Sequence, residues 1–449
     1  MNFLAEKLAT CDAGDILWFS AEAAPVDALR LAFAIAHVPV KDWQGKRVAL
    51  GNMPVIELVV ALIFLDGLAE AILLLPNEDD AQTRAMRLAQ ANIDVVVEHD
   101  GLEFSKFLEL ATAATISNKT SLIVERPAPI ATTWLLPTSG TTGTPKLIPH
   151  SFASLTRSMS ARSIGNEYVW GSLYSLRRFA GLQVFLQSWM CGTPLVLKEE
   201  SADLSDVLAR FIAFGCNALS ATPSMWRKLA MHPLFDQLTL KQITLGGEIV
   251  DQSVLDMLTK RFPAARITHI YASTEAGVGF AVRDGKSGFP AEFLISPPSG
   301  VAMRVNEHGH LCFSPTLDQT SALNADSTWV DSGDVVETHA TRVHFLGRAN
   351  GSINVGGNKV MPEEVESVIK ELPEVAFVEV RARKSAILGN LVEAAITPKK
   401  DTLFDAAFKK KITTHCRARL DGFKVPAFIV AAPAIELTAS GKLSRMNVE

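Results

Sequence analysis

Short apolar segments alternate with longer segments along the first 130 residues of the chain. The segments Arg47–Leu50 and Ile93–Val97 are rich in aliphatic and β-branched side chains, which is typical of buried strands. The longer segments Pro54–Leu65 and Asp80–Ala91 predict helices between the strands. This alternation predicts an α/β fold with doubly wound, mainly parallel sheets and with ligand loops at the strand ends.

The pattern changes twice further along the chain. Strands at Thr193–Leu197 and Ala218–Ser220 flank a predicted helix at Leu204–Phe214, which continues the α/β order. From residue 296 to 346, short strands separated by Gly and Pro predict a small β-subdomain. Its expected strands are Val301–Val305, Leu311–Ser314, Val335–Glu337 and Val343–Leu346.

A turn-rich break at Gly347–Gly351 precedes a different kind of segment. The last hundred residues predict a compact α+β unit. Its expected helices are Pro362–Leu372 and Leu403–Leu420, and its expected strands are Val375–Arg381, Leu391–Thr397 and Phe428–Val430. We therefore expect one domain at residues 1–349 and a second at residues 350–449.

The charge distribution supports this division. Residues 350–449 hold 15 Lys and Arg against 12 Asp and Glu, so they carry +3, while residues 1–349 carry −8 and the whole chain carries −5. A chain with this balance has no broad basic field for nucleic acid, and we expect no nucleic-acid partner.

The cysteines and the apolar stretches indicate a cytoplasmic protein. The five cysteines are scattered without metal-ligand or redox spacing, so reduced thiols are expected. Met1–Lys7 lacks the pattern of a signal peptide. The most membrane-like stretch, Val55–Leu75, is interrupted by Glu57, Asp66, Gly67 and Glu70. Its uninterrupted apolar run, Leu58–Leu65, is far shorter than the ~20 residues that span a bilayer. We expect a core helix followed by a strand, and no membrane partner.

The segment Thr138–Lys146 reads Thr-Ser-Gly-Thr-Thr-Gly-Thr-Pro-Lys and follows a β-prone stretch at Ile130–Leu136. A helix is expected after it from Ser151, a good N-cap residue. A small-residue loop between strand and helix exposes backbone N–H groups, which, with its hydroxyls and its lysine, suit a polyphosphate. The spacing differs from a Walker A loop. An ordinary polar surface turn is the alternative.

This segment resembles the phosphate loop of the adenylate-forming superfamily, which includes acyl-CoA synthetases, luciferases and peptide-synthetase adenylation domains. The resemblance implies that the loop binds the phosphates of ATP, and that Thr142 takes part in catalysis. The ATP-binding residues implied here are Thr138, Ser139, Gly140, Thr141, Gly143 and Lys146.

Two further motifs resemble the same family in the expected order. Ile270–Gly277 is similar to its Tyr-Gly-x-Thr-Glu motif and follows an expected strand at Arg266–Ile270. The resemblance implies that Tyr271 stacks on adenine, that Thr274 contacts phosphate and that Glu275 serves catalysis and Mg²⁺. Ala272 stands where the family usually has Gly, next to Ser273. Upstream, Gly246, Gly247 and Glu248 resemble the turn on the adenine side.

The segment Trp329–Asp334 resembles the family motif Trp-x-x-Thr-Gly-Asp, with Ser332 in place of Thr. The resemblance implies that Asp334 accepts hydrogen bonds from the ribose hydroxyls, which a carboxylate suits well. Arg348 matches an arginine that reaches the ribose or phosphate. An aspartate in a hairpin turn is the alternative for this motif.

The C-terminal motifs imply a mobile second domain. Asn350 falls at the family's hinge position, where Asp or Lys is common, and Asn354 replaces a frequent lysine. Gly356, Gly357 and Lys359 match the loop beside the pantetheine tunnel. Lys442, in Thr438–Arg445, matches the adenylation lysine. Taken alone, a lysine so near the end of the chain would be a solvated charge.

The resemblance implies that ATP activates a carboxylic acid as an acyl-adenylate with release of pyrophosphate, and that a thiol then takes the acyl group. Mg²⁺ is implied as a cofactor. The acceptor is CoA or the phosphopantetheine of an acyl carrier protein. An inactive adenylate-binding regulatory protein is a different possibility, and the joint presence of the motif residues disfavours it.

The acid pocket is expected between the phosphate loop and Tyr271. No Asp lies between Arg157 and Lys198, which disfavours an α-amino acid. The residues assigned to the pocket are Tyr174, Arg178, Phe179 and Ser220. Together with Trp170 and Trp226, the residues Tyr174, Phe179 and Ser220 could line an aryl or medium-length apolar pocket. A surface or ATP-proximal charge is an equal alternative for Arg178.

Overall fold

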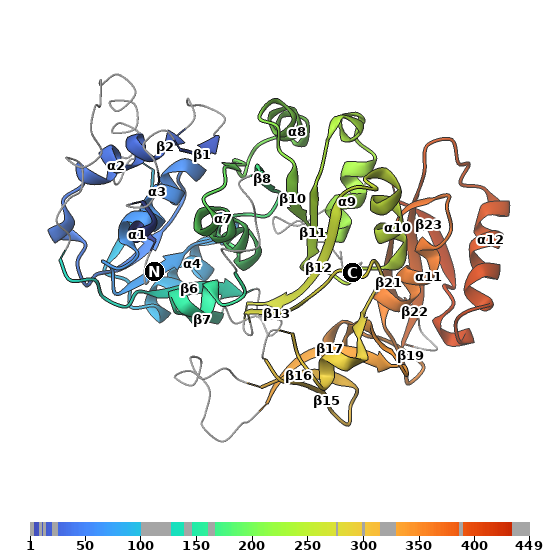
Figure 1. Cartoon of the computed structure of the whole chain (residues 1–449). Coiled ribbons are helices and arrows are strands. Elements are labelled where there is room, and N and C mark those ends of the chain that lie inside the picture. Colours follow the sequence, from blue (N-terminus) through green and yellow to red (C-terminus); the bar gives the residue numbers. More distant parts are fainter. Residues whose placement is uncertain are drawn as a thin grey trace.

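The computed structural model shows three parts side by side and a small sheet below them (Figure 1). It describes residues 4–8, 11, 15–19, 26–99, 127–138, 146–159, 167–274, 277–298, 301–314, 329–385 and 389–432, without the side chains of Ile16 and Phe19. The first two parts are large sheets with their helices, which confirms the expected α/β class.

The first large sheet has the order β5-β3-β4-β6-β7, and its strands are parallel except for β7. Its strands are β3 (Arg47–Leu50), β4 (Ala71–Leu74), β5 (Val95–Val97), β6 (Thr133–Thr138) and β7 (Lys146–His150). The helices of this region are α3 (Val55–Leu65), α4 (Ala81–Gln90) and α6 (Phe152–Thr156).

The second large sheet has the order β13-β12-β11-β10-β8-β9-β1-β2, with antiparallel strands only at its two edges. Its strands are β1 (Ile16–Phe19), β2 (Val26–Asp27), β8 (Trp170–Ser172), β9 (Leu195–Val196), β10 (Ala218–Ala221), β11 (Gln242–Gly246), β12 (Arg266–Ser273) and β13 (Gly277–Val282). The associated helices are α1 (Ala5–Leu8), α2 (Ala28–Ala36), α7 (Phe179–Cys191), α8 (Leu204–Ala213), α9 (Pro223–Ala230) and α10 (Gln252–Arg261).

Helix α3 is the core helix expected from its composition. Every one of its residues is buried, and it shares one hydrophobic cluster with residues of both large sheets. A helix that is apolar on all sides has to be covered on all sides. The acidic residue that ends it is also satisfied, because Asp66 accepts hydrogen bonds from Leu4 N at 2.7 Å and from Trp134 Nε1 at 3.0 Å.

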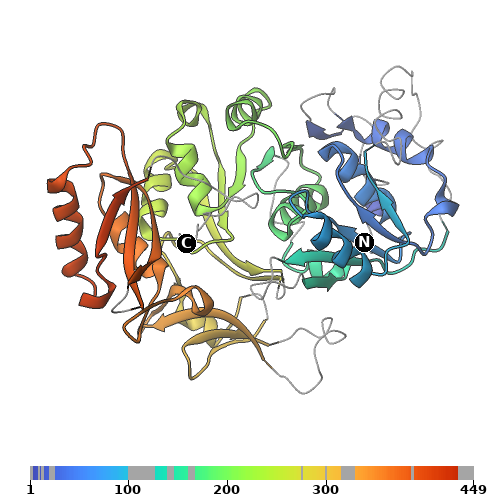
Figure 2. The same ribbon diagram turned by 180° about the vertical axis from the view of Figure 1, so that it is seen from behind.

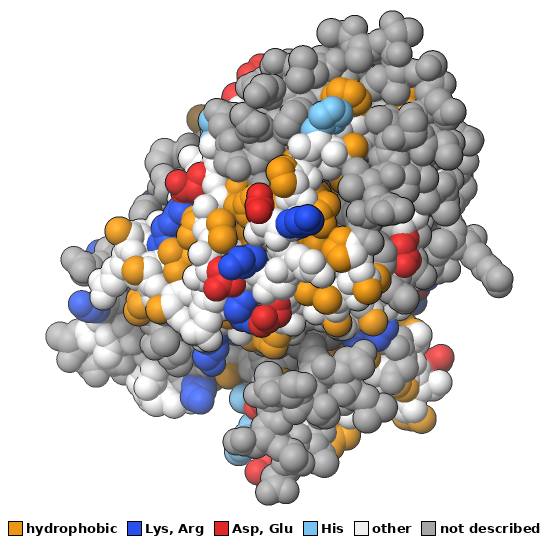
Figure 3. Space-filling view, turned by 90° about the vertical axis from the view of Figure 1, so that its left-hand side faces the viewer, with side chains coloured by type: hydrophobic (Ala, Val, Ile, Leu, Met, Phe, Trp, Pro, Cys, Tyr) orange, Lys and Arg blue, Asp and Glu red, His pale blue; other side chains and the backbone are white. Residues whose placement is uncertain are grey.

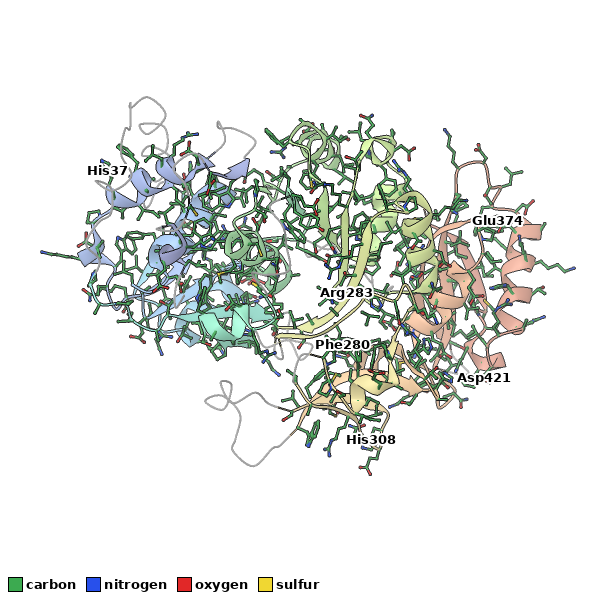
Figure 4. All side chains as sticks on the ribbon, viewed as in Figure 1. His37, Phe280, Arg283, His308, Glu374 and Asp421 are labelled. Atoms are coloured by element: carbon green, nitrogen blue, oxygen red, sulfur yellow. The ribbon has the colours of Figure 1, made fainter. Side chains whose placement is uncertain are left out.

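The small β-subdomain is an antiparallel sheet in the order β14-β18-β17-β16-β15, as expected from the short strands. Its strands are β14 (Phe289–Pro290), β15 (Met303–Val305), β16 (His310–Phe313), β17 (Val330–Thr338) and β18 (Arg342–Arg348). Phe280 of β13, labelled in Figure 4, packs into the same hydrophobic cluster as this sheet. The cluster fixes the small sheet against the edge of the second large sheet.

The C-terminal residues form a separate α+β unit with its own hydrophobic cluster. Seen from either side, the unit lies at the end of the molecule, beyond α10 (Figures 1 and 2). Its strands are β19 (Ile353–Val355), β20 (Asn358–Val360), β21 (Val375–Ser385), β22 (Gly389–Pro398) and β23 (Phe428–Ala431), and its helices are α11 (Pro362–Lys370) and α12 (Ala406–Arg417). The sequence pattern predicted these helices and three of these strands, but not the β19–β20 hairpin.

The surface is mixed in charge. Figure 3 shows acidic and basic side chains interspersed on one face of the molecule, with no large area of one sign among its coloured residues. Within the described part of the chain, no helix has the length and apolar character needed to cross a membrane.

An ion cluster joins the C-terminal unit to the second large sheet. Asp251, the N-cap of α10, accepts a hydrogen bond from Arg227 of α9 at 2.5 Å, and Lys370 Nζ of α11 lies 3.9 Å from its other oxygen. Burial alone would raise the pKa of Asp251. The charges of Arg227 and Lys370 outweigh this effect and lower the pKa to about 2.

Replacing Asp251 with Asn is expected to lower the free energy of unfolding by about 2 kcal/mol at neutral pH. The folded pKa of about 2 lies below the ordinary 3.8, so this stabilisation is present above pH 3.8 and is lost as the pH falls towards 2. Urea unfolding at several pH values should therefore show the difference from wild type shrinking on acidification. Asp256→Asn, on the exposed face of the same helix, serves as the control. A difference that does not change with pH would contradict the assignment.

Candidate nucleotide and acid site

Three residues assigned to ATP from separate motifs meet at one carboxylate. The Tyr271 hydroxyl donates a hydrogen bond to Asp334 Oδ2 at 2.6 Å, and Arg348 Nε donates to Asp334 Oδ1 at 2.9 Å. Asp334 and Arg348 face each other across β17 and β18, whereas Tyr271 comes from β12. The cluster therefore links the small sheet to the second large sheet.

The ring of Tyr271 is stacked among phenylalanines. Its centroid lies 5.2–5.3 Å from those of Phe280, Phe313 and Phe345, with interplanar angles of 4–16°. Burial, together with the charge of Asp334, raises the pKa of the Tyr271 hydroxyl. The hydroxyl therefore stays protonated and donates. Stacking of this ring on adenine stays a prediction.

The strand expected at Arg266–Ile270 is longer in the structure. Strand β12 does not end at residue 270, because Tyr271, Ala272 and Ser273 extend it and pair with β13. Gly277, at φ +71°, resumes the chain after the turn, in a conformation that favours glycine. Thr274 is the last described residue before this turn, and Glu275 lies outside the described residues.

The two ends of the phosphate segment lie on neighbouring antiparallel strands. Thr138 ends β6, Lys146 begins β7, and the two residues face each other across the antiparallel pair. The expected direct step from strand to helix is therefore wrong, because β7 intervenes before α6 begins after its N-cap, Ser151. Ser139, Gly140, Thr141, Thr142 and Gly143 lie outside the described residues.

Residues assigned to the acid pocket and to the adenine-side turn also come together. The Tyr174 hydroxyl donates to the carbonyl oxygen of Gly246 at 3.1 Å. Burial, with the charge of Glu248, raises the pKa of the Tyr174 hydroxyl, which outweighs the lowering effect of Ser220. Gly247 follows Gly246 with φ +83°, which turns the chain towards Glu248.

Glu248 is held at the start of a helix. Its Oε2 accepts a hydrogen bond from the backbone N–H of Ser224, in the first turn of α9, at 2.9 Å. A carboxylate is favourable at this end of a helix. Trp226 of the same helix is fully buried and its Nε1 donates to Thr244 O, so this ring belongs to the hydrophobic core.

Two adjacent arginines follow β8, and the structure separates their roles. Arg178 forms an ion pair with Glu78, and both side chains are partly exposed. Arg177, which the sequence did not single out, is only 1% exposed. Its Nη1 donates to the carbonyl oxygens of Leu50 at 2.9 Å and Leu75 at 3.3 Å, at the ends of β3 and β4. The only signal for Arg177 in the sequence is its place next to Arg178, because adjacent side chains differ in direction.

A cavity of about 450 Å³ lies beside Arg177, where loops follow β3, β4, β5 and β9. Glu199 in its wall accepts from Val55 N at the start of α3, and Glu200 accepts from Ser175 Oγ at 2.6 Å. The lining residues are Asn52, Met53, Pro54, Val55, Leu58, Asn77, His99, Leu176, Arg177, Lys198, Glu199, Glu200 and Ser201. Phe179 begins α7 close by in sequence and is nearly buried.

The residues assigned to the hinge and to the thiol tunnel lie at the entry to the C-terminal unit. Asn350 is in a short 3₁₀ turn directly after β18. Gly356 and Gly357 form the β19–β20 turn with φ +57° and +92°, and Asn354 Oδ1 accepts from Gly357 N at 2.9 Å. Lys359 faces Asn354 across this hairpin and is exposed. Lys442 lies outside the described residues.

A metal site is not visible in the described residues. Within them, no three His, Cys, Asp or Glu side chains are grouped so that they could hold a metal ion. The residue expected to serve Mg²⁺, Glu275, is not among them.

Solved structures share the whole fold. The anthranilate CoA ligase bound to anthranoyl-AMP is similar with a TM-score of 0.78 at 18% identity, covering 98% of this chain and 95% of that one. A benzoate CoA ligase from Burkholderia xenovorans gives 0.76 at 17% identity, covering 99% and 98%. At these identities the likeness concerns the fold.

Curated proteins match at low identity over most of this chain. A 2-succinylbenzoate–CoA ligase from Listeria monocytogenes is 25% identical, with 91% of this chain and 92% of that protein covered. Nonribosomal peptide synthetase 2 of Gibberella zeae is also 25% identical, but this chain spans only 7% of its length. The model of the AMP-binding enzyme family matches residues 59–314, more than half of the chain, and the model of the AMP-binding enzyme C-terminal domain matches residues 364–442. This chain belongs to the AMP-binding enzyme family.

Proposed function

We propose that this enzyme uses ATP to convert a carboxylic acid into an acyl-adenylate, with release of pyrophosphate, and then transfers the acyl group to the thiol of CoA. The observation that carries the proposal is the Tyr271–Asp334–Arg348 cluster, which joins residues of three separate motifs at one carboxylate. The relatives matched over most of their length, named 2-succinylbenzoate–CoA ligase, support the same chemistry.

A carboxylate is already ionised at neutral pH, so its attack on the α-phosphate needs no general base. The barrier comes from an anion approaching a polyanion. This barrier would be lowered by positioning and by electrostatic stabilisation. The groups proposed for this role are Lys442, Lys146, Thr142 and the backbone N–H groups of the phosphate loop. Mg²⁺, held through Glu275 when bound, would neutralise part of the phosphate charge.

We propose an aromatic acid as the substrate. The relatives and neighbours carry the names of 2-succinylbenzoate, benzoate and anthranilate ligases. Tyr174, Phe179 and Ser220 would contact the acid. Because Arg178 is paired with Glu78, a direct contact between Arg178 and the substrate would require that pair to open.

Two domain orientations would serve the two steps. We propose a boundary between residues 349 and 350, with Asn350 as the hinge. Rotation about this hinge would move Lys442 away from the site and bring the Gly356–Gly357 turn and Lys359 to it. We also propose a cytoplasmic location, since all five cysteines are free thiols.

The proposal is tested by incubating the protein with ATP, Mg²⁺, CoA and a panel of aromatic, aliphatic and amino acids. Pyrophosphate release with an aromatic acid, followed by an acyl-CoA product, is expected. Binding of ATP without pyrophosphate release across the whole panel would favour the inactive adenylate-binding alternative.

The same assay, run with phosphopantetheinylated carrier proteins in place of CoA, tests the acceptor. The C-terminal unit carries +3, but Lys411 of α12 is paired with Glu374 and Arg419 with Glu371, so part of its basic face is neutralised. Lys410 and Arg417 remain exposed for either acceptor. We expect CoA to be preferred. A kcat/KM about a hundredfold higher for a carrier protein would overturn that choice and leave the adenylation chemistry standing.

A further inference from the structure

Two hairpins, one from each large sheet, meet where the ATP-binding motifs lie. The phosphate segment connects β6 to β7, and Thr274 directly follows β12, which pairs with β13. Figures 1 and 2 both show the β12–β13 hairpin ending beside β7. Since the two hairpins belong to different sheets, strand pairing does not set the distance between them.

One buried side chain connects the two hairpins. His150, the last residue of β7, is 3% exposed, and its Nε2 lies 2.8 Å from the carbonyl oxygen of Thr274. A carbonyl oxygen only accepts, so Nε2 carries the proton and donates it. Lys146 is the first residue of the same strand. Strand β7 thus has a predicted phosphate ligand at one end and this contact at the other.

The imidazole ring is itself fixed. Its Nδ1 lies 3.1 Å from Ser154 Oγ, and Ser154 forms a capping box with Ser151 at the start of α6. The ring also packs on Phe179, with the centroids 5.7 Å apart. The contact to Thr274 is therefore made by a group with little freedom to move.

A second contact reaches β13, the strand that pairs with the end of β12. Arg157 Nη2, just after α6, lies 3.5 Å from the carbonyl oxygen of Val278. Groups from residues 150–157 thus contact a carbonyl oxygen just after β12 and another on β13. No motif assigns a role to His150.

We infer that His150 is a positioning residue for adenylation: its Nε2–H fixes the Thr274 carbonyl, and with it the end of β12 that carries Tyr271, relative to Lys146 on β7. The inference rests on the proposed function. The effect is geometric, because a small displacement of groups around a reacting phosphate can cost about a hundredfold in rate.

The test compares His150→Leu, which removes the donor, with His150→Gln, whose side-chain N–H can replace it. His269→Leu is the matched control. His269 is also buried on β12, and its Nε2 donates to Lys286 O at 3.0 Å, away from the hairpin turn. Hydrogen–deuterium exchange of residues 274–280 reports on the turn without any need for activity.

In His150→Leu, exchange of this segment is expected to be about tenfold faster, as for loss of one hydrogen bond, and to return to nearly the wild-type rate in His150→Gln. The kcat/KM for ATP in pyrophosphate exchange should fall about 30-fold in His150→Leu and recover to within about threefold of wild type in His150→Gln. The His269→Leu control should leave both readouts unchanged.

The inference is overturned if His150→Gln is no better than His150→Leu, or if His269→Leu has the same effect. It is also overturned if His150→Leu mainly raises the KM for the acid. That result would indicate that the substitution disturbs Phe179, which packs on His150 and is assigned to the acid pocket. If wild-type protein releases no pyrophosphate, the proposed function fails. The hydrogen–deuterium exchange measurement alone then decides the role of His150.

Discussion

Replacing Lys442 with alanine is expected to slow acyl-adenylate formation by several hundredfold or more, on the order of 4 kcal/mol. Loss of one preorganised cation from a water-poor phosphate site has an effect of this size, because negative charge grows at the α-phosphate during attack. Single-turnover formation of the adenylate from ATP and acid measures it directly.

The second half-reaction separates this role from a general defect. Thioester formation from supplied acyl-adenylate should be much less affected, because under the proposed domain rotation Lys442 serves adenylation only. Lys400→Ala, at an exposed position in the same C-terminal unit, is the matched control and should leave both half-reactions unchanged. Equal losses in the two half-reactions of Lys442→Ala would contradict the assignment.

The strands and helices that could be predicted are those whose side-chain pattern is strong over a whole element. Helix α3 is an example, because eleven residues that are almost all apolar have no stable alternative to a buried helix. The β1 strand shows the limit of this reasoning. It is four residues long, and its place in the second sheet depends on pairing with β9, far away in the chain.

The motifs in the sequence indicate candidate site residues but not the contacts between them. Tyr271, Asp334 and Arg348 were each found from a motif, yet nothing local indicates that the tyrosine hydroxyl binds the aspartate. The sequence also does not show which of the adjacent residues Arg177 and Arg178 is buried. Adjacent side chains differ in direction, and only the ends of β3 and β4 decide which one is buried.

Replacing Asp334 with Asn is expected to lower kcat/KM for ATP about a hundredfold, which corresponds to about 3 kcal/mol. Asparagine keeps the shape but loses the charge, and its NH₂ group cannot accept the hydrogen bond that Tyr271 or Arg348 now donates. The same loss applies to the ribose hydroxyls that the carboxylate is proposed to bind. Initial rates of pyrophosphate exchange at varied ATP measure the effect.

A second aspartate–arginine pair, whose arginine lies on the same strand as Arg348, provides the control. Arg342 begins β18, the strand that Arg348 ends, and its Nη1 donates to Asp284 at 2.7 Å. Asp284→Asn removes a comparable charged pair away from the proposed site, so kcat/KM for ATP should change less than about twofold. If Asp334→Asn were equally mild, the carboxylate would only brace Tyr271 and Arg348, and the ribose would have to be bound by other groups.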